Sequence, residues 1–130
     1  MEIDHIGYAV KNIDKSIIEF KKLGYVFENI IIDVKRNINI CFGSLDGYRI
    51  ELVSPYDKNQ SSPVDNYIKG NCNTPYHICY KSADLENVIS DLQSDGFLLV
   101  KEPDKACAFD NKRVAFMFNS KVGIFEIVES

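Results

Sequence analysis

Two histidines and two glutamates occupy equivalent places in a repeated sequence. Residues 77–80 (His-Ile-Cys-Tyr) repeat residues 5–8 (His-Ile-Gly-Tyr), and residues 125–128 (Phe-Glu-Ile-Val) match residues 50–53 (Ile-Glu-Leu-Val). Each half therefore carries a histidine near its start and a glutamate near its end. Imidazole and carboxylate groups together suit a borderline divalent cation. The sequence predicts one metal ion held by His5, Glu51, His77 and Glu126, with Ni²⁺, Co²⁺ or Zn²⁺ preferred and Mn²⁺ or Fe²⁺ as alternatives.

The alternation of side chains along β-strands predicts where these four residues point. Glu51 alternates with Ile50 and Leu52, and Glu126 alternates with Phe125 and Ile127. Because successive strand residues face opposite ways, the apolar neighbours are expected to face a helix and the glutamates the other side of the sheet. A carboxylate among aliphatic residues is costly to bury unless a cation or hydrogen bonds compensate it. The alternative interpretation has hydrogen-bonded histidines, and glutamates paired with Arg49 or Arg113.

The chain reads as two units with the same order of elements. Asn12 is a predicted N-cap for a helix over 13–23, and Asp84 caps a second helix over 84–94. Strands are predicted over 3–10, 25–32, 37–43 and 48–54, and over 75–81, 97–101, 112–119 and 122–129. The predicted fold class is α+β: two tandem βαβββ modules forming a curved mixed sheet around a metal-binding cup. Residues 1–130 are expected to form a single domain, with module 1 over about 1–56, a polar connector over about 57–74 and module 2 over about 75–130.

Composition excludes several classes of function. The net charge of −4 comes without a basic stripe, which disfavours a nucleic-acid partner. Apolar runs fall short of the ~20 residues of a membrane span, so no membrane partner is predicted. The four cysteines lack Cys-x-x-Cys spacing and are expected to be free thiols, which favours a cytoplasmic location.

Further polar residues share the predicted ligand faces. Arg49 lies two residues from Glu51, and Lys81 lies four residues from His77, so both are candidates for contact with an anionic substrate. Asn39 belongs to a polar row expected on the cup face. A salt bridge, or a half-exposed strand, would explain each of them equally well. Open sheet edges predict a homodimer, and the four ligands could come from one chain or from two.

The whole chain resembles the vicinal oxygen chelate superfamily, in its glyoxalase I and methylmalonyl-CoA epimerase branch. The motifs that carry this resemblance are His5–Val10, Ile50–Pro55, Ser62-Pro63, Tyr76–Ile78, Val114–Phe116 and Phe125–Glu129. The resemblance implies that His5, Glu51, His77 and Glu126 are the metal ligands. It also implies that a carboxylate moves a proton next to a metal-bound substrate oxygen. Resemblance to glyoxalase I makes Glu126 the base, with Glu51 as the other candidate.

Differences from the epimerase decide between the two functions. The epimerase has a second acid/base before the strand of Glu51, where this chain offers Asp33 at best, and residues 104–111 lack the epimerase loop's glycines and histidine. The leading prediction is therefore a glyoxalase I-like lyase acting on the hemithioacetal of a 2-oxoaldehyde. A methylmalonyl-CoA epimerase-like enzyme is the alternative, and a non-catalytic drug- or metabolite-binding protein of the bleomycin-resistance type is the third interpretation. The expected partner is a small molecule, such as a thiol or CoA conjugate.

Overall fold

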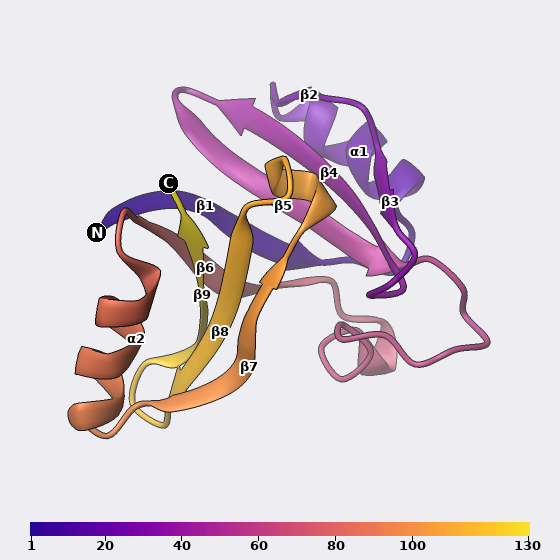
Figure 1. Cartoon of the computed structure of the whole chain (residues 1–130). Coiled ribbons are helices and arrows are strands. Elements are labelled where there is room, and N and C mark those ends of the chain that lie inside the picture. Colours follow the sequence, from indigo (N-terminus) through magenta and orange to yellow (C-terminus); the bar gives the residue numbers. More distant parts are fainter. The chain divides into compact units, whose positions relative to one another are not determined.

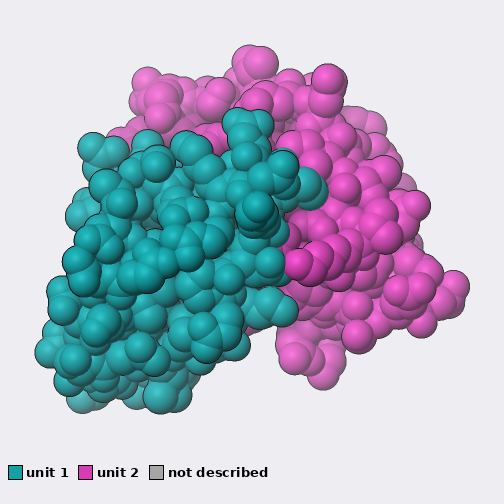
Figure 2. All heavy atoms as spheres, in the orientation of Figure 1, with its two compact units in different colours: residues 1–4, 77–130 teal, residues 5–76 magenta. Residues whose placement is uncertain are grey.

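The protein forms two compact units, which Figure 2 distinguishes by colour. The structure, a computed structural model, describes residues 1–130 apart from the side chain of Asn71, a residue of the predicted connector. The unit drawn in magenta in Figure 2 comprises residues 5–76, and we call it the first unit because it comes first along the chain. The unit drawn in teal comprises residues 1–4 together with 77–130, and we call it the second unit. The first unit thus holds most of module 1 and the whole predicted connector, and the second holds most of module 2.

The unit of residues 5–76 contains the first half of the repeat (Figure 1). Its elements are β1 (Glu2–Ala9, of which residues 2–4 belong to the other unit), α1 (Ile13–Lys22), β2 (Val26–Phe27), β3 (Ile31–Asp33), β4 (Ile38–Leu45), β5 (Tyr48–Pro55) and the 3₁₀ turn η1 (Lys69–Asn71). The strands pair in the order β2-β4-β5-β1, and β3 also pairs with β4. Only β1 and β5 are parallel among these pairs of described strands. The predicted strand 25–32 is divided into the short strands β2 and β3.

The other unit repeats this plan in the second half of the chain. Its elements are β6 (Thr74–Ser82), α2 (Leu85–Ser94), β7 (Leu98–Lys105), the 3₁₀ turn η2 (Cys107–Phe109), β8 (Arg113–Asn119) and β9 (Gly123–Glu129). The strands pair in the order β6-β9-β8-β7. The pair β6–β9 is parallel, while β8 pairs antiparallel with both β7 and β9. Both halves therefore have mixed sheets, and the predicted α+β fold class is confirmed.

The helices begin where the sequence predicts. The side chain of Asn12 accepts a hydrogen bond from the backbone N–H of Lys15 at 3.0 Å, and Asp84 accepts one from Asn87 at 3.1 Å. Each side chain thereby satisfies one backbone donor that a helix N-terminus leaves without an intrahelical partner. After the helices, Gly24 and Gly96 adopt φ values of +106° and +89°, a conformation that suits glycine at the end of a helix.

Each helix covers one face of its own sheet with apolar side chains. In the first unit, Ile13 of α1 packs with Ile50 and Leu52 of β5. In the second, α2 contributes to the cluster of Leu85, Ile89, Ala115, Met117, Phe125 and Ile127. The strand residues on either side of Glu51 and of Glu126 therefore face a helix, as predicted. The glutamates consequently point to the opposite face of each sheet.

Among the described residues, no helix combines the length and apolarity needed to cross a membrane.

Arg113 links the start of β8 to the end of β9 and to α2. Its guanidinium binds the carboxylates of Glu129 and Glu86, and hydrogen bonds from Arg113 hold the pKa of both carboxyl groups below the usual range. A lowered folded-state pKa stabilises the protein above the unfolded pKa of about 4.5, and this contribution disappears as the pH falls through the folded-state values.

We expect Arg113→Met to lower the melting temperature at pH 7, and the difference from the wild type to shrink as the pH falls from about 5 to 3. Thermal unfolding followed by circular dichroism measures this difference. Lys121→Met, at an exposed basic residue of the turn between β8 and β9, is the control. A difference that stays constant from pH 7 to pH 3 would contradict the role given to these ion pairs.

Candidate metal centre

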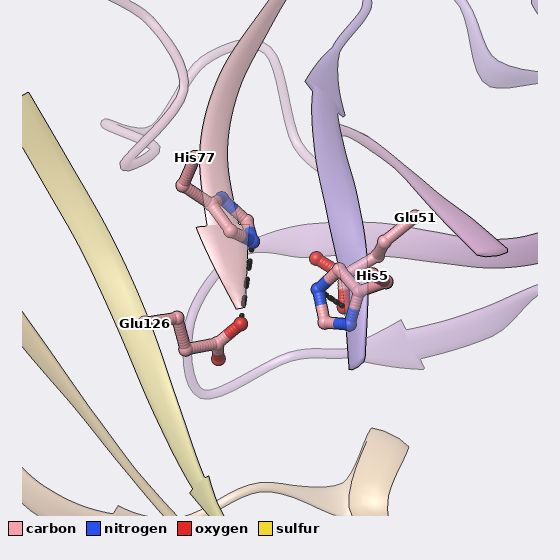
Figure 3. A group of neighbouring side chains, drawn as sticks. All are labelled: His5, Glu51, His77 and Glu126. Carbon is pink, nitrogen blue, oxygen red and sulfur yellow. Dashed lines mark ion pairs between the residues drawn. The ribbon is translucent and has the colours of Figure 1, made fainter. Parts of the chain in front are cut away.

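The first unit buries a histidine beside a glutamate on two parallel strands. His5 lies on β1 and Glu51 on β5, where Gly7 is the residue that pairs with Glu51. The side chains reach across the strands, and His5 Nε2 lies 3.7 Å from Glu51 Oε2 (Figure 3). Only 1% of His5 and 5% of Glu51 is exposed. The first half of the repeat thus holds an imidazole and a carboxylate together away from bulk water.

The second unit contains the same arrangement. His77 lies on β6 and Glu126 on the parallel strand β9, where Cys79 pairs with Glu126. His77 Nε2 is 3.3 Å from Glu126 Oε2, and each residue is 4% exposed (Figure 3). In both units, the glutamate pairs with the residue two positions after the histidine. The repeat seen in the sequence is therefore also a repeat of side-chain geometry.

An aromatic ring accompanies each pair, and sequence reasoning missed both rings as site residues. Phe42 pairs across the strands with Glu51 and presents a ring perpendicular to His5, with centroids 5.6 Å apart. Phe116 pairs with Glu126 in the same way and lies 5.7 Å from His77. Edge-to-face aromatic contacts favour one orientation of the imidazole. Aligning the two hairpins on their glutamates would have revealed the equivalent phenylalanines.

The chemistry of each pair suits a metal ion. The four residues are buried and offer imidazole nitrogens and carboxylate oxygens as ligand atoms. Both ligand types bind borderline divalent ions in their neutral-imidazole and ionised-carboxylate forms. The alternative partner Arg113 binds Glu129 and Glu86. Each unit therefore contains a buried histidine–glutamate pair that could hold a metal ion.

Of the two basic residues predicted to contact the substrate, only Arg49 lies beside a histidine–glutamate pair. Arg49 shares the face of Glu51 on β5, and its guanidinium lies 3.9 Å from the centre of the Phe42 ring and 3.8 Å from Glu28. Lys81 forms ion pairs with Glu2 at 3.6 Å and Asp4 at 3.9 Å. Arg49 thus lies beside a histidine–glutamate pair, whereas the ammonium group of Lys81 is held by the carboxylates of β1.

The face predicted for Asn39 is wrong. On β4 it is Phe42 that pairs with Glu51, so the polar row of β4 lies on the opposite face of the sheet. Asn39 pairs with Ser54 and donates hydrogen bonds to Ser54 Oγ and to the carbonyl of Pro55. Cys41, in the same row, packs in the helix-covered core, and burial raises the pKa of its thiol. Both residues have structural roles away from the candidate ligands.

Asp33 lies on the same face as Glu51, at the end of β3. It pairs with Ile38, which alternates in phase with Phe42 along β4. Its carboxylate is buried and accepts hydrogen bonds from the backbone N–H of Arg36 at 3.0 Å and from the Arg36 guanidinium at 2.9 Å. Asp33 therefore stabilises the turn between β3 and β4.

Comparison with known proteins identifies the family. The glyoxalase/bleomycin resistance protein/dioxygenase superfamily matches residues 4–116. The chain belongs to this superfamily. The predicted resemblance to the vicinal oxygen chelate proteins is thereby confirmed. No curated protein matches the chain in sequence.

Solved structures share the fold at low sequence identity. A methylmalonyl-CoA epimerase from Mycobacterium tuberculosis superposes with a TM-score of 0.83 at 24% identity, covering 98% of this chain and 87% of that one. A hypothetical protein from Bacillus halodurans gives 0.85 at 22% identity, covering 99% and 94%. A Streptomyces coelicolor methylmalonyl-CoA epimerase, in complex with 2-nitronate-propionyl-CoA, gives 0.83 at 19% identity, covering 100% and 97%. At these identities the comparison establishes the superfamily fold.

Proposed function

We propose that His5, Glu51, His77 and Glu126 together hold one divalent metal ion. A single pair offers two ligands, whereas ions of this class take four or more. Both pairs are buried and have the same donor atoms, and each buried carboxylate needs compensating positive charge. A shared ion would meet both requirements. Ni²⁺, Co²⁺ and Zn²⁺ suit the mixed nitrogen and oxygen donors, as do Mn²⁺ and Fe²⁺.

The reaction that this donor set best supports is proton transfer at a carbon next to a carbonyl group. When bound, the ion supplies positive charge where negative charge develops on the substrate oxygen. In our proposal, the carboxylate of Glu126 accepts the proton from one side of the carbon, and Glu51, protonated at that stage, returns a proton to the other side. The two residues exchange these roles for the opposite epimer. Phe42 and Phe116 lie across the strands from the two glutamates, which are both buried.

We propose an epimerase that acts on a 2-substituted acyl thioester, with methylmalonyl-CoA as the first substrate to test. The observation that carries this proposal is the presence of an equivalent buried glutamate in each unit, because inversion of a carbon centre requires a proton donor and a proton acceptor on opposite sides. The similar structures named as methylmalonyl-CoA epimerases support the choice of substrate.

A glyoxalase I-like lyase is the second candidate. The lyase reaction needs only one base. It is favoured because Asp33, the candidate for the second acid/base of an epimerase, accepts hydrogen bonds from Arg36. The substrate in that case would be the hemithioacetal of a 2-oxoaldehyde. A homodimer in the cytoplasm stays a prediction for either enzyme.

Metal binding should depend on all four ligands. We expect about one ion per chain, and we expect His5→Ala, Glu51→Gln, His77→Ala and Glu126→Gln each to weaken affinity by more than the roughly 10–100-fold cost of losing a supporting hydrogen bond. Calorimetric titration of chelator-treated protein with Co²⁺, Ni²⁺ or Zn²⁺ measures this. Glu102→Gln, at an exposed glutamate of β7, is the control. If the substitutions in one unit alone weakened binding, a shared ion would be excluded.

Proton exchange separates the candidate reactions. In D₂O, the metal-loaded protein should exchange the 2-proton of both epimers of methylmalonyl-CoA and interconvert them, as followed by proton NMR. Glu126→Gln and Glu51→Gln, each with its metal content verified, should abolish interconversion, leaving slower exchange of one epimer only. Loss of a general base typically costs about 10²–10⁴-fold.

Other results of the exchange experiment would contradict the epimerase. Formation of a thioester from methylglyoxal and a thiol, without exchange into either epimer, would favour the lyase. Binding of the thioester without exchange or thioester formation would favour the non-catalytic binding protein.

Arg49 is our candidate for binding an anionic group of the substrate. Its guanidinium lies on the face of Glu51, over the ring of Phe42, where a fixed orientation lets it direct charge-assisted hydrogen bonds. Arg49→Met should lower kcat/KM by roughly 10–100-fold, the equivalent of one such hydrogen bond. Arg49→Lys should restore part of this loss.

Steady-state kinetics with methylmalonyl-CoA and with its pantetheine analogue would locate the anion. An equal loss for both substrates indicates the substrate carboxylate, and a loss confined to the CoA substrate indicates a nucleotide phosphate. Unchanged kcat/KM for both would exclude Arg49 from binding.

A further inference from the structure

The two histidine–glutamate pairs are alike, but the sheet surfaces beside them differ in polarity. Next to Glu51, the following cross-strand pair toward the hairpin turn is Ser44 with Arg49. At the equivalent place next to Glu126, the pair is Phe118 with Ile124. The first surface is polar and charged, whereas the second is entirely apolar. The two units therefore present different surfaces beside equivalent histidine–glutamate pairs.

The apolar surface extends onto the next strand. Leu98 of β7 pairs with Phe118, and Phe118 pairs with Ile124. Directly opposite residues of paired antiparallel strands share a face, and so do alternate residues along one strand. Leu98, Phe118 and Ile124, which we call the apolar patch, therefore lie on the same face as Phe116 and Glu126.

The apolar patch does not serve the core of its unit. The core beneath α2 is formed from the other face of the sheet, where Leu99 pairs with Met117. At the far end of the sheet face that carries Glu126, Ala106 and Phe109 of the η2 segment cover Val114 and Val128. The patch lies beyond this cover, and Leu98 and Phe118 remain 62% and 37% exposed.

Exposed apolar side chains that adjoin a buried polar cluster are typical of a ligand-binding surface. We infer that the apolar patch binds an aliphatic substituent of the substrate, several carbons longer than a methyl group. This inference rests on the proposed function, because the substituent is taken to belong to the molecule bound at the histidine–glutamate pairs. It makes Leu98 and Phe118 specificity-determining residues, and it narrows the substrate class to acyl compounds with an aliphatic substituent of several carbons.

Chain length provides a test that does not require turnover. Alkyl hydroxamates present two neighbouring oxygens to a metal ion and carry an alkyl chain of chosen length. For the metal-loaded protein, calorimetry should show affinity rising about fourfold for each added methylene over the first few carbons, from the acetyl to the hexanoyl compound, as expected for burial of that group. The dependence should then level off where the patch ends.

Substitutions in the apolar patch should change only the dependence of hydroxamate affinity on alkyl chain length. Phe118→Ser and Leu98→Ser should reduce the increment to less than about twofold per methylene while leaving the affinity for acetohydroxamate unchanged. Val26→Ser is the matched control, because Val26 occupies the position equivalent to Leu98 in the other module and pairs with Ser44. All three residues are at least partly exposed, so folded protein is expected and circular dichroism verifies it.

Three results would overturn the inference. One is an affinity independent of chain length in the wild type, and another is an increment that Val26→Ser reduces as much as Phe118→Ser does. The third is loss of self-association in Phe118→Ser by sedimentation, which would assign the patch to a second copy of the chain. A chain-length dependence without proton exchange in methylmalonyl-CoA would contradict the proposed reaction and support the patch. Proton exchange without a chain-length dependence would support the proposed reaction and contradict the role given to the patch.

Discussion

The cost of burying a carboxylate is the constraint on which this structure depends. Glu51 and Glu126 lie within the sheets at 5% and 4% exposure, where an isolated charge would cost several kcal/mol. Each has a histidine nitrogen within 3.7 Å and a phenylalanine across the strand. The apolar residues on either side of each glutamate must then face a helix. One polar position per unit thereby determines which face of the sheet is core and which is available for chemistry.

Parallel pairing of the histidine strand with the glutamate strand enforces this geometry twice. Glu51 pairs with Gly7 and Glu126 with Cys79, so each carboxylate meets the same side of its histidine strand. A shift of one residue in either register would turn the glutamate into the helix-covered core and separate it from the imidazole. The apolar clusters beneath α1 and α2 therefore stabilise the site as well as the fold, because they hold these registers in place.

The sequence predicts the ligand pairs and the helices because both depend on local or repeated patterns. Asn12 and Asp84 act through hydrogen bonds three residues away, which sequence reveals directly. Which face of the sheet each row of β4 side chains occupies does not follow from a local pattern. Its apolar row shares the face of Glu51, and in its polar row the amide of Asn39 donates to the carbonyl of Pro55. In the turn just before β4, the amide of Asn37 donates to the carbonyls of Asp57, Gln60 and Ser61. Polarity alone therefore assigned Asn39 to the wrong face.

Duplication explains why the histidine–glutamate pairs are alike, and divergence explains where specificity can arise. The two pairs offer the same donor groups, yet a substrate such as the proposed acyl thioester carries chemically different groups. Discrimination must therefore come from positions outside the repeated histidine, glutamate and phenylalanine. Arg49 and Ile124 occupy equivalent strand positions, two residues before Glu51 and Glu126, and they have opposite chemical character. The departures from the repeat, more than the repeat itself, carry the information about which molecule the protein recognises.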